Sequence, residues 1–258
     1  MKKHIFIALS AALMTVFLSC NKDPEPDVPA IILTTKESGP IIFYLDGSGL
    51  VTINWGDGTA KETRELPTNI QFYHFLEGRT PCTIKIYGNG ITNFKCERYI
   101  TSLDVSGAIA LKYLDCSDNQ LTSLDVSNNI ALEYLDIGVQ IFGNPNQLTN
   151  LDVSNNTVLE YLDCSYNQLT SLDVSNNIVL EYLDCSSNQL TSLDVSNNSV
   201  LSSLRCLSND LQTEALNALF HSLHSNMIPG VVKSIIIFFN PGAIDCDIKI
   251  ANDKGWHL

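Results

Sequence analysis

Leucine recurs through the middle of the chain at two alternating intervals. The leading leucines are separated by 10 or 11 residues, with one wider step of 16. The two intervals add to a period of 21, and a fixed period of this size indicates supersecondary units that stack on one another. The wider step holds an insertion between Asp136 and Gln147. The leading leucines are Leu111, Leu121, Leu132, Leu148, Leu159, Leu169, Leu180, Leu190, Leu201 and Leu211.

Each period contains two similar halves. Residues 180–188 read LEYLDCSSN and residues 190–198 read LTSLDVSNN, so both fit the pattern L-x-x-L-x-[LVC]-x-x-N. This pattern is the signature of leucine-rich repeats. The alternation of the two halves resembles the nested class of bacterial leucine-rich repeats called IRREKO. The resemblance covers residues 91–211 and implies a solenoid of stacked coils.

The alternation inside each half predicts which side chains are buried. Leu183 and Cys185 lie two positions apart and point to one face of a strand, whereas Tyr182, Asp184 and Ser186 point to the other. Successive coils would stack about 4.8 Å apart and align their leucines in apolar columns. Because both halves carry the strand pattern, we expect parallel sheets on two sides of a flattened coil, with little helix.

An asparagine follows each half of the repeat. Its side-chain amide can bond backbone groups of its own coil and of the adjacent coil, so we interpret this position as structural. The asparagines are Asn119, Asn129, Asn156, Asn167, Asn177, Asn188, Asn198 and Asn209.

Cysteine fills the third apolar position of the tyrosine-containing half, where it would act as a small buried hydrophobe. No C-x-x-C spacing for zinc is present, and stacked parallel side chains suit disulfides poorly. Cys82 and Cys246 are better placed for a bridge, although we expect none. The cysteines of the repeat are Cys96, Cys116, Cys164, Cys185 and Cys206, with Ile137 in the inserted repeat.

Residues 31–90 lack the repeat and alternate like strands. The segment Trp55-Gly56-Asp57-Gly58-Thr59 resembles a shortened W-x-F-G-D-G-T signature of the PKD family, and the residues around His74 resemble its later pattern. The resemblance implies an immunoglobulin-like β-sandwich, which would cap the open end of the solenoid. Asp57 either bonds its own backbone in the turn or ligates a cation, and we favour the first.

The N-terminus has the pattern of a lipoprotein signal peptide over residues 1–20. Lys2 and Lys3 precede an apolar run from Ile5 to Leu18 that is too short to span a bilayer. The run ends in FLSC, which resembles a lipobox and implies lipidation of Cys20; the alternative is an ordinary cysteine near a plain cleavage site.

Residues 21–30 are a linker rich in proline and charge. Behind a lipidated cysteine, such a stretch resembles the surface-export signal of Bacteroidetes lipoproteins; the alternative is a solvated tether. We expect a lipid-anchored protein of the outer membrane, exposed at the cell surface, that contacts the membrane through its lipid.

The tail, residues 212–258, has the pattern of a closing cap. An amphipathic helix is predicted from Thr213, a buried strand over 234–239 and a short helix over 246–254, with His221, His224 and His257 at the surface. The predicted fold class is therefore mainly β: a leucine-rich-repeat solenoid with parallel sheets, preceded by an immunoglobulin/PKD-like β module and closed by an α/β C-terminal cap.

The net charge of −13 is concentrated in the repeats. Residues 101–200 hold 13 Asp and Glu against one Lys, a balance of −12. This argues against nucleic acid and against an anionic membrane surface, which need clustered cations. No Ser-His-Asp set, metal cluster or phosphate loop is apparent, so we expect no enzyme activity, no cofactor and no metal.

Outward positions of the tyrosine-containing half are the candidate binding residues. One interpretation is a solvated coat in which tyrosine supplies β propensity. The other is a recognition surface for a protein partner with a basic surface, and a glycan is the alternative ligand. The candidate residues are Tyr113, Asp115, Tyr134, Asp136, Tyr161, Asp163, Tyr182 and Asp184.

Overall fold

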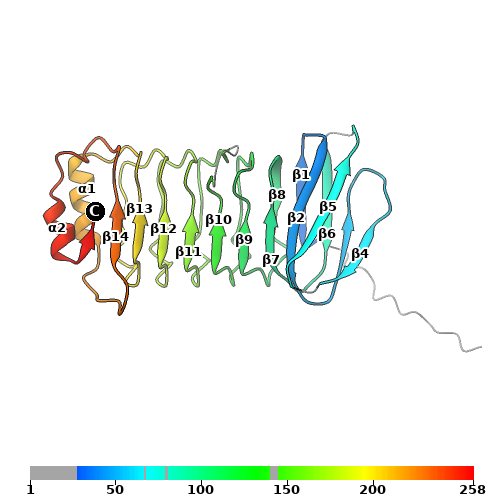
Figure 1. Cartoon of the computed structure of the whole chain (residues 1–258), viewed down its shortest axis with the longest axis horizontal. Coiled ribbons are helices and arrows are strands. Elements are labelled where there is room, and N and C mark those ends of the chain that lie inside the picture. The colour runs from blue at the N-terminus through cyan, green and yellow to red at the C-terminus, as the bar shows by residue number, and fades with distance from the viewer. Residues whose placement is uncertain (1–27, 67, 79–80, 140–144) are drawn as a thin grey trace, which may run out of the picture.

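The computed structural model describes residues 28–66, 68–78, 81–139 and 145–258, so Cys20, the predicted signal peptide and most of the linker lie outside the described residues. Its strands form two sheets (Figure 1). The smaller sheet has the order β4-β3-β6-β1-β8, and the larger has the order β15-β14-β13-β12-β11-β10-β9-β7-β2-β5. In the described helices no segment is both long and apolar enough to cross a bilayer.

The N-terminal part is built from antiparallel strands in both sheets. Phe43 of β2 lies at the centre of its core, with ring centroids 5.3 Å from Phe72 and 5.5 Å from Trp55. The strands are β1 (Ile31–Thr35), β2 (Gly39–Gly47), β3 (Leu50–Asn54), β4 (Glu62–Glu65), β5 (Ile70–Leu76), β6 (Cys82–Tyr87), β7 (Ile91–Cys96) and β8 (Ile100–Asp104).

The last two of these strands join the N-terminal part to the repeats. β8 pairs antiparallel with β1 in the smaller sheet. β7 pairs antiparallel with β2 on one side and parallel with β9 (Tyr113–Asp115) on the other. The larger sheet is therefore continuous from the N-terminal strands into the solenoid, and the first apolar coil has β-structure stacked against it. The predicted boundary at residue 91 lies at the start of the strand that both parts share.

The solenoid strands pair parallel with identical residues opposite one another. Leu114 pairs with Leu135, which pairs with Leu162, and the column continues through Leu183 and Leu204. All five side chains are fully buried, which confirms the predicted apolar column. The remaining strands of this column are β10 (Tyr134–Asp136), β11 (Tyr161–Asp163), β12 (Tyr182–Asp184) and β13 (Ser203–Arg205).

The expected second sheet was wrong. In residues 121–126, 148–153, 169–174 and 190–195 the apolar side chains are buried and no strand is formed; the first counterpart, Ile100–Asp104, forms β8, but it pairs with β1 and not with another coil. One backbone bond joins adjacent coils where this half begins, as from Gln147 N–H to Leu121 O at 2.7 Å. At its end Asn129 Nδ2 donates to Val105 O. The alternation of apolar and polar residues predicts which side chains are buried. It does not predict whether the backbones of adjacent coils come close enough to form the hydrogen bonds of a sheet.

Buried asparagines confirm their predicted structural role. Asn188 Nδ2 donates to Cys164 O of the preceding coil at 2.9 Å and to Cys185 O of its own coil at 3.1 Å. Its Oδ1 accepts the Leu169 N–H at 2.9 Å. Two further residues, Asn146 after the insertion and Asn240 in the cap, make the same kind of contacts and were not anticipated.

The cysteines of the repeat form a buried column and are free thiols. Burial raises the pKa of each of them, to about 12 for Cys206. Ile137 takes the same position in the inserted repeat and is also fully buried. Cys82 and Cys246 are free thiols as well.

The C-terminal cap continues the solenoid before closing it. β14 (Lys233–Ile236) pairs parallel with β13 and places Ile235 beside Leu204, and β15 (Trp256–His257) pairs with β14. Helices α1 (Thr213–Ser222) and α2 (Ile248–Asp253) pack at this end (Figure 1). His221 and His257 are exposed as predicted, whereas His224 is half-buried because it bonds Leu201 O and meets the Trp256 ring.

The asparagine contacts predict a large stability difference between two similar substitutions. Asn188→Ala would leave a buried N–H and carbonyls unsatisfied, and we expect it to lower the free energy of unfolding by about 2–4 kcal/mol. Asn176→Ala removes one exposed bond to Ser154 O and should change it by less than about 0.5 kcal/mol. Urea unfolding followed by circular dichroism measures both, and equal losses would contradict the structural role.

Candidate functional site

Four tyrosines form one continuous stack on the outer face of the parallel sheet. The ring centroids of Tyr113, Tyr134, Tyr161 and Tyr182 are 4.3, 4.2 and 4.4 Å apart in order, with interplanar angles of 11°, 9° and 2°. These separations are shorter than the strand spacing of about 4.8 Å, so the rings converge and lie in contact. Each side chain is half-buried. We call this set the tyrosine stack; inside it, ring faces cover one another and ring edges remain accessible.

The aspartates beside the tyrosine stack are not displayed to solvent as predicted. Asp115, Asp136 and Asp184 are 1%, 3% and 7% exposed, and Asp163 is half-buried. The reason is that each carboxylate turns back to its own chain: Asp184 Oδ1 accepts the Ser186 N–H at 2.9 Å, and Asp163 Oδ1 accepts the Ser165 N–H at 2.9 Å. These bonds form turns that end each strand. We call these four residues the aspartate column.

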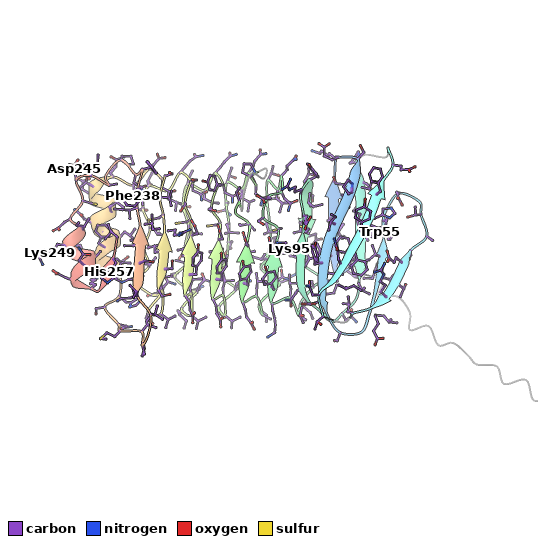
Figure 2. The ribbon with its side chains drawn as sticks, viewed as in Figure 1. Trp55, Lys95, Phe238, Asp245, Lys249 and His257 are labelled. Carbon is purple, nitrogen blue, oxygen red and sulfur yellow. The ribbon has the colours of Figure 1, made fainter. Side chains whose placement is uncertain are left out.

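A cation lies at each end of the aspartate column. Lys95 of β7 is in register with Asp115, and its Nζ donates to Asp115 Oδ2 at 2.6 Å. Arg205 of β13 is in register with Asp184, with Nη1 3.9 Å from Asp184 Oδ2. The two cations offset part of the repulsion between carboxylates that the parallel register brings close together. Figure 2 shows Lys95 where the N-terminal strands meet the solenoid.

One carboxylate of the aspartate column, Asp163, and the phenols of the tyrosine stack have shifted pKa values. Burial raises the pKa of Asp163 above its ordinary value, and the neighbouring Asp184 carboxylate raises it further, although a bond from Ser165 opposes the shift. Burial and the Asp136 carboxylate raise the pKa of Tyr134 well above its ordinary value. The phenols of the stack therefore stay protonated at neutral pH and can donate hydrogen bonds.

The other half of each repeat carries a row of exposed aspartates. Asp125, Asp152 and Asp173 are exposed, and each accepts the N–H of the serine two residues later at 2.9 Å. Hydrogen bonds from that serine lower the pKa of all three. Asp194 is exposed in the same position. Much of the acidic surface therefore lies on the half of the coil opposite the tyrosine stack.

The residues of the PKD-like signature form one hydrogen-bonded cluster. Asp57 Oδ1 accepts both the N–H and the hydroxyl of Thr59, and Asp57 Oδ2 is 2.6 Å from His74 Nε2. The His74 ring stacks on Trp55 at 4.4 Å. Burial alone would raise the pKa of Asp57, but the bonds from His74 and Thr59 bring it well below its ordinary value. One carboxylate oxygen thus bonds within the turn, in agreement with the favoured interpretation, and the other links the turn to His74 of β5.

Sequence reasoning missed the two cations and could have found them. Phe94-Lys95-Cys96 and Leu204-Arg205-Cys206 align with the Leu-Asp-Cys of the inner repeats, so the basic residues occupy the aspartate position. The sequence signal for these cations was the replacement of the acidic residue by a basic residue in the first and last repeats. Within the described ranges, no group of three or more His, Cys, Asp or Glu side chains is placed to hold a metal ion.

No protein-family model and no curated protein matches the sequence. Similar solved structures include the functional domain of InlJ from Listeria monocytogenes, described as including a cysteine ladder, with 35% identity over 60% of this chain and a TM-score of 0.48. An internalin, InlF, from a strain of the same species has 23% identity over 59% and a TM-score of 0.49. The leucine-rich repeat domain of APL1B has 22% identity over 53% and a TM-score of 0.38.

The chain spans less than half of each of these structures, since the matches cover 31%, 43% and 45% of their chains. The assignment of fold therefore depends on the chain's own repeat, its buried leucine column and its in-register parallel sheet. These features define a leucine-rich-repeat solenoid, joined at its N-terminal end to antiparallel strands and closed at the other by an α/β cap.

The shifted carboxylates predict opposite pH effects for two matched substitutions. The raised pKa of Asp163 means that the folded state loses stability as pH rises from the ordinary range of aspartate through the folded-state pKa. Asp163→Asn keeps the turn acceptor and removes the charge. We expect it to raise the melting temperature at neutral pH, with a gain that shrinks in acid.

Asp173→Asn is the control, because its lowered pKa has the reverse consequence. The stability that this carboxylate contributes is present above the ordinary pKa and is lost as pH falls through the folded-state pKa. The variant should melt slightly lower at neutral pH and match the parent in acid. Calorimetry across the two pH ranges measures both, and a lower melting temperature for Asp163→Asn at neutral pH would refute the assignment.

Proposed function

We propose that the chain is a non-enzymatic binding module that recognises a protein partner through the tyrosine stack. The observation that supports this most directly is the geometry of the stack: aromatic edges and hydroxyls in a straight, half-exposed row on a rigid sheet. Tyrosine provides large contact area together with a hydrogen-bonding group, and it is enriched in protein interfaces.

The rigidity of the stack supports affinity as well as recognition. Each inner tyrosine is held between two others, so its side-chain freedom is lost on folding and not on binding. Binding then costs less conformational entropy than it would with mobile side chains, for which the cost is about 0.5–1.5 kcal/mol each. A preorganised row of this kind suits a partner with an extended surface.

The charge of the surface favours a basic partner. The aspartate column contributes little to direct contact because it is buried and bounded by Lys95 and Arg205. Exposed glutamates, Glu160 and Glu181, immediately precede Tyr161 and Tyr182 along the chain. Together with the exposed aspartates of the other half, they give the solenoid a negative field that steers cations towards it.

A glycan is the second candidate ligand. Sugar rings stack on aromatic faces, but the faces of Tyr134 and Tyr161 are covered by their neighbours on both sides. The stack as a whole therefore favours a protein, and a sugar can reach a tyrosine face at the ends of the row.

We further propose that the module is displayed on the outside of a Gram-negative-type cell, anchored by lipid on Cys20. The support is the sequence of residues 1–30, with its basic start, apolar run, lipobox-like ending and charged linker. A solenoid joined to antiparallel strands behind such a linker would stand clear of the membrane.

The binding proposal predicts that capture depends on the tyrosine stack and not on the other half of the coil. Residues 21–258 would serve as bait for purified extracellular-matrix proteins and for outer-membrane extracts of other bacteria. We expect replacement of Tyr113, Tyr134, Tyr161 and Tyr182 by Ser to abolish capture of any partner. Replacement of Asp125, Asp152, Asp173 and Asp194 by Ser should preserve it.

Two checks keep that experiment interpretable. Replacement of the four tyrosines by Phe preserves the stacked rings and removes the hydroxyls, so it should fold like the parent and bind more weakly. Circular dichroism verifies that each variant is folded. A partner captured equally well by the folded Ser variant would eliminate the tyrosine stack as its binding surface.

The localisation proposal predicts that Cys20→Ser releases the protein from membranes. Without a thiol at this position no lipid can be attached, and the tether loses its anchor. In a Gram-negative host we expect the parent to incorporate labelled palmitate, to sediment with outer membranes and to be removed from intact cells by protease. The variant should do none of these, and membrane association that survives the substitution would contradict lipid anchoring.

A further inference from the structure

A pocket of about 370 Å³ lies at the N-terminal end of the tyrosine stack. It is in the part of the larger sheet where β5, β2, β7 and β9 lie side by side, near the point where Figure 2 labels Lys95. This volume is near the lower end of the range for small-molecule sites, about 300–1,000 Å³. The residues that line it and carry the argument are Tyr44, Asp46, Asn93, Lys95, Glu97 and Tyr113.

The pocket exists because the tyrosine stack ends there. Across the sheet, Tyr113 pairs with Asn93, and Asn93 pairs with Asp46. A short amide therefore occupies the position where the next ring would lie, and among the described residues no ring stacks on the face of Tyr113 turned away from Tyr134. Tyr44 lies beyond Lys95 in the neighbouring row and provides a second aromatic wall.

The polar groups of the pocket are already held in place. Lys95 Nζ is fixed by Asp115 Oδ2 at 2.6 Å, and the Tyr44 hydroxyl donates to Glu97 Oε1 at 3.2 Å. Asp46 accepts the backbone N–H of Asn69, which also lines the pocket. The side chains of Tyr44, Asp46, Lys95 and Glu97 are half-buried, as expected for groups that line a concavity. Ordered donors and acceptors around an aromatic face suit a ligand that stacks and hydrogen-bonds at once.

The charges of the pocket select among ligands of this size. A cation such as a guanidinium would approach the ammonium of Lys95, and an anion would approach the carboxylates of Asp46 and Glu97. A neutral ring with several hydroxyls can instead accept from the ammonium and the amides and donate to the carboxylates. The mixed lining therefore fits a sugar better than it fits an ion.

We propose that this pocket binds a single neutral pyranose ring of a glycan. One face of the ring lies on Tyr113, and its hydroxyls bond to Asn93, Lys95 and Glu97. This site shares Tyr113 with the proposed protein-binding surface but uses a different part of it: the protein-binding surface uses the edges of the tyrosine stack, whereas the pocket uses the ring face at its end.

The test uses the folded chain without residues 1–20 and defined probes. Saturation-transfer NMR would be recorded with the methyl glycosides of glucose, galactose, mannose and N-acetylglucosamine, and with N-methylguanidinium as the cationic probe. For at least one glycoside we expect ring-proton contacts and a dissociation constant on the order of 1 mM, which is typical of a single ring with few contacts. Binding of N-methylguanidinium without any glycoside, or of neither probe, would overturn the proposal.

Two matched variants locate the site. Tyr113→Ala should weaken glycoside binding at least tenfold, whereas Tyr182→Ala, which removes the ring at the opposite end of the same stack, should leave it unchanged. Asn93→Leu removes the polar floor, places an apolar side chain beside Tyr113 and leaves all four tyrosines in place, and it should also abolish binding. Equal losses in Tyr113→Ala and Tyr182→Ala, or undiminished binding in Asn93→Leu, would place the sugar elsewhere. Because Asn93 lies outside the tyrosine stack, Asn93→Leu should still capture a protein partner, which separates this inference from the proposed function.

Discussion

Parallel pairing of each coil with the same residues of the next coil is the constraint on which the rest of this structure depends. The register places Leu135 beside Leu114 and Leu162, and the same holds for every other position of the strand. Each residue type therefore meets its own copy about 4.8 Å away. For leucine, cysteine and tyrosine this arrangement is favourable, because apolar atoms and rings gain contact. For aspartate it is unfavourable, because like charges are brought together.

The aspartate column shows how the fold tolerates that cost. Each carboxylate is bonded into the turn that ends its strand, and the column ends in a cation on both sides. The first and last coils differ from the inner ones because each has a different neighbour: antiparallel strands on one side and the cap on the other. The same change of neighbour ends the tyrosine stack at Asn93 and leaves a pocket there. Side chains that differ from the repeated ones therefore lie at the two ends of the solenoid. The coils between them present rows of identical side chains.

Much of the fold could be predicted because the same short pattern of apolar and polar residues recurs in successive repeats, and its recurrence makes the prediction more certain than one copy would. The inward leucines and cysteines, the structural asparagines and the helix–strand–helix tail are confirmed. The second sheet was wrong, since alternation of burial is the same whether or not neighbouring backbones come within bonding distance. The exposure of Asp115 and its counterparts was also wrong. Side-chain alternation assigns a residue to the outer face of a strand, but neighbouring rings and a turn can still cover it.

The sequence by itself determined the period of the coil, the identity of its core and the rows of identical side chains on its outer face. These follow from the spacing of residues alone, because equivalent positions in successive repeats lie one above another in the stacked coils. Only the tertiary structure decided which rows are accessible, how closely the rings stack and where the rows end. Those properties depend on contacts between residues far apart in the chain, such as Tyr44 with Glu97 and Lys95 with Asp115, and no local pattern encodes such contacts.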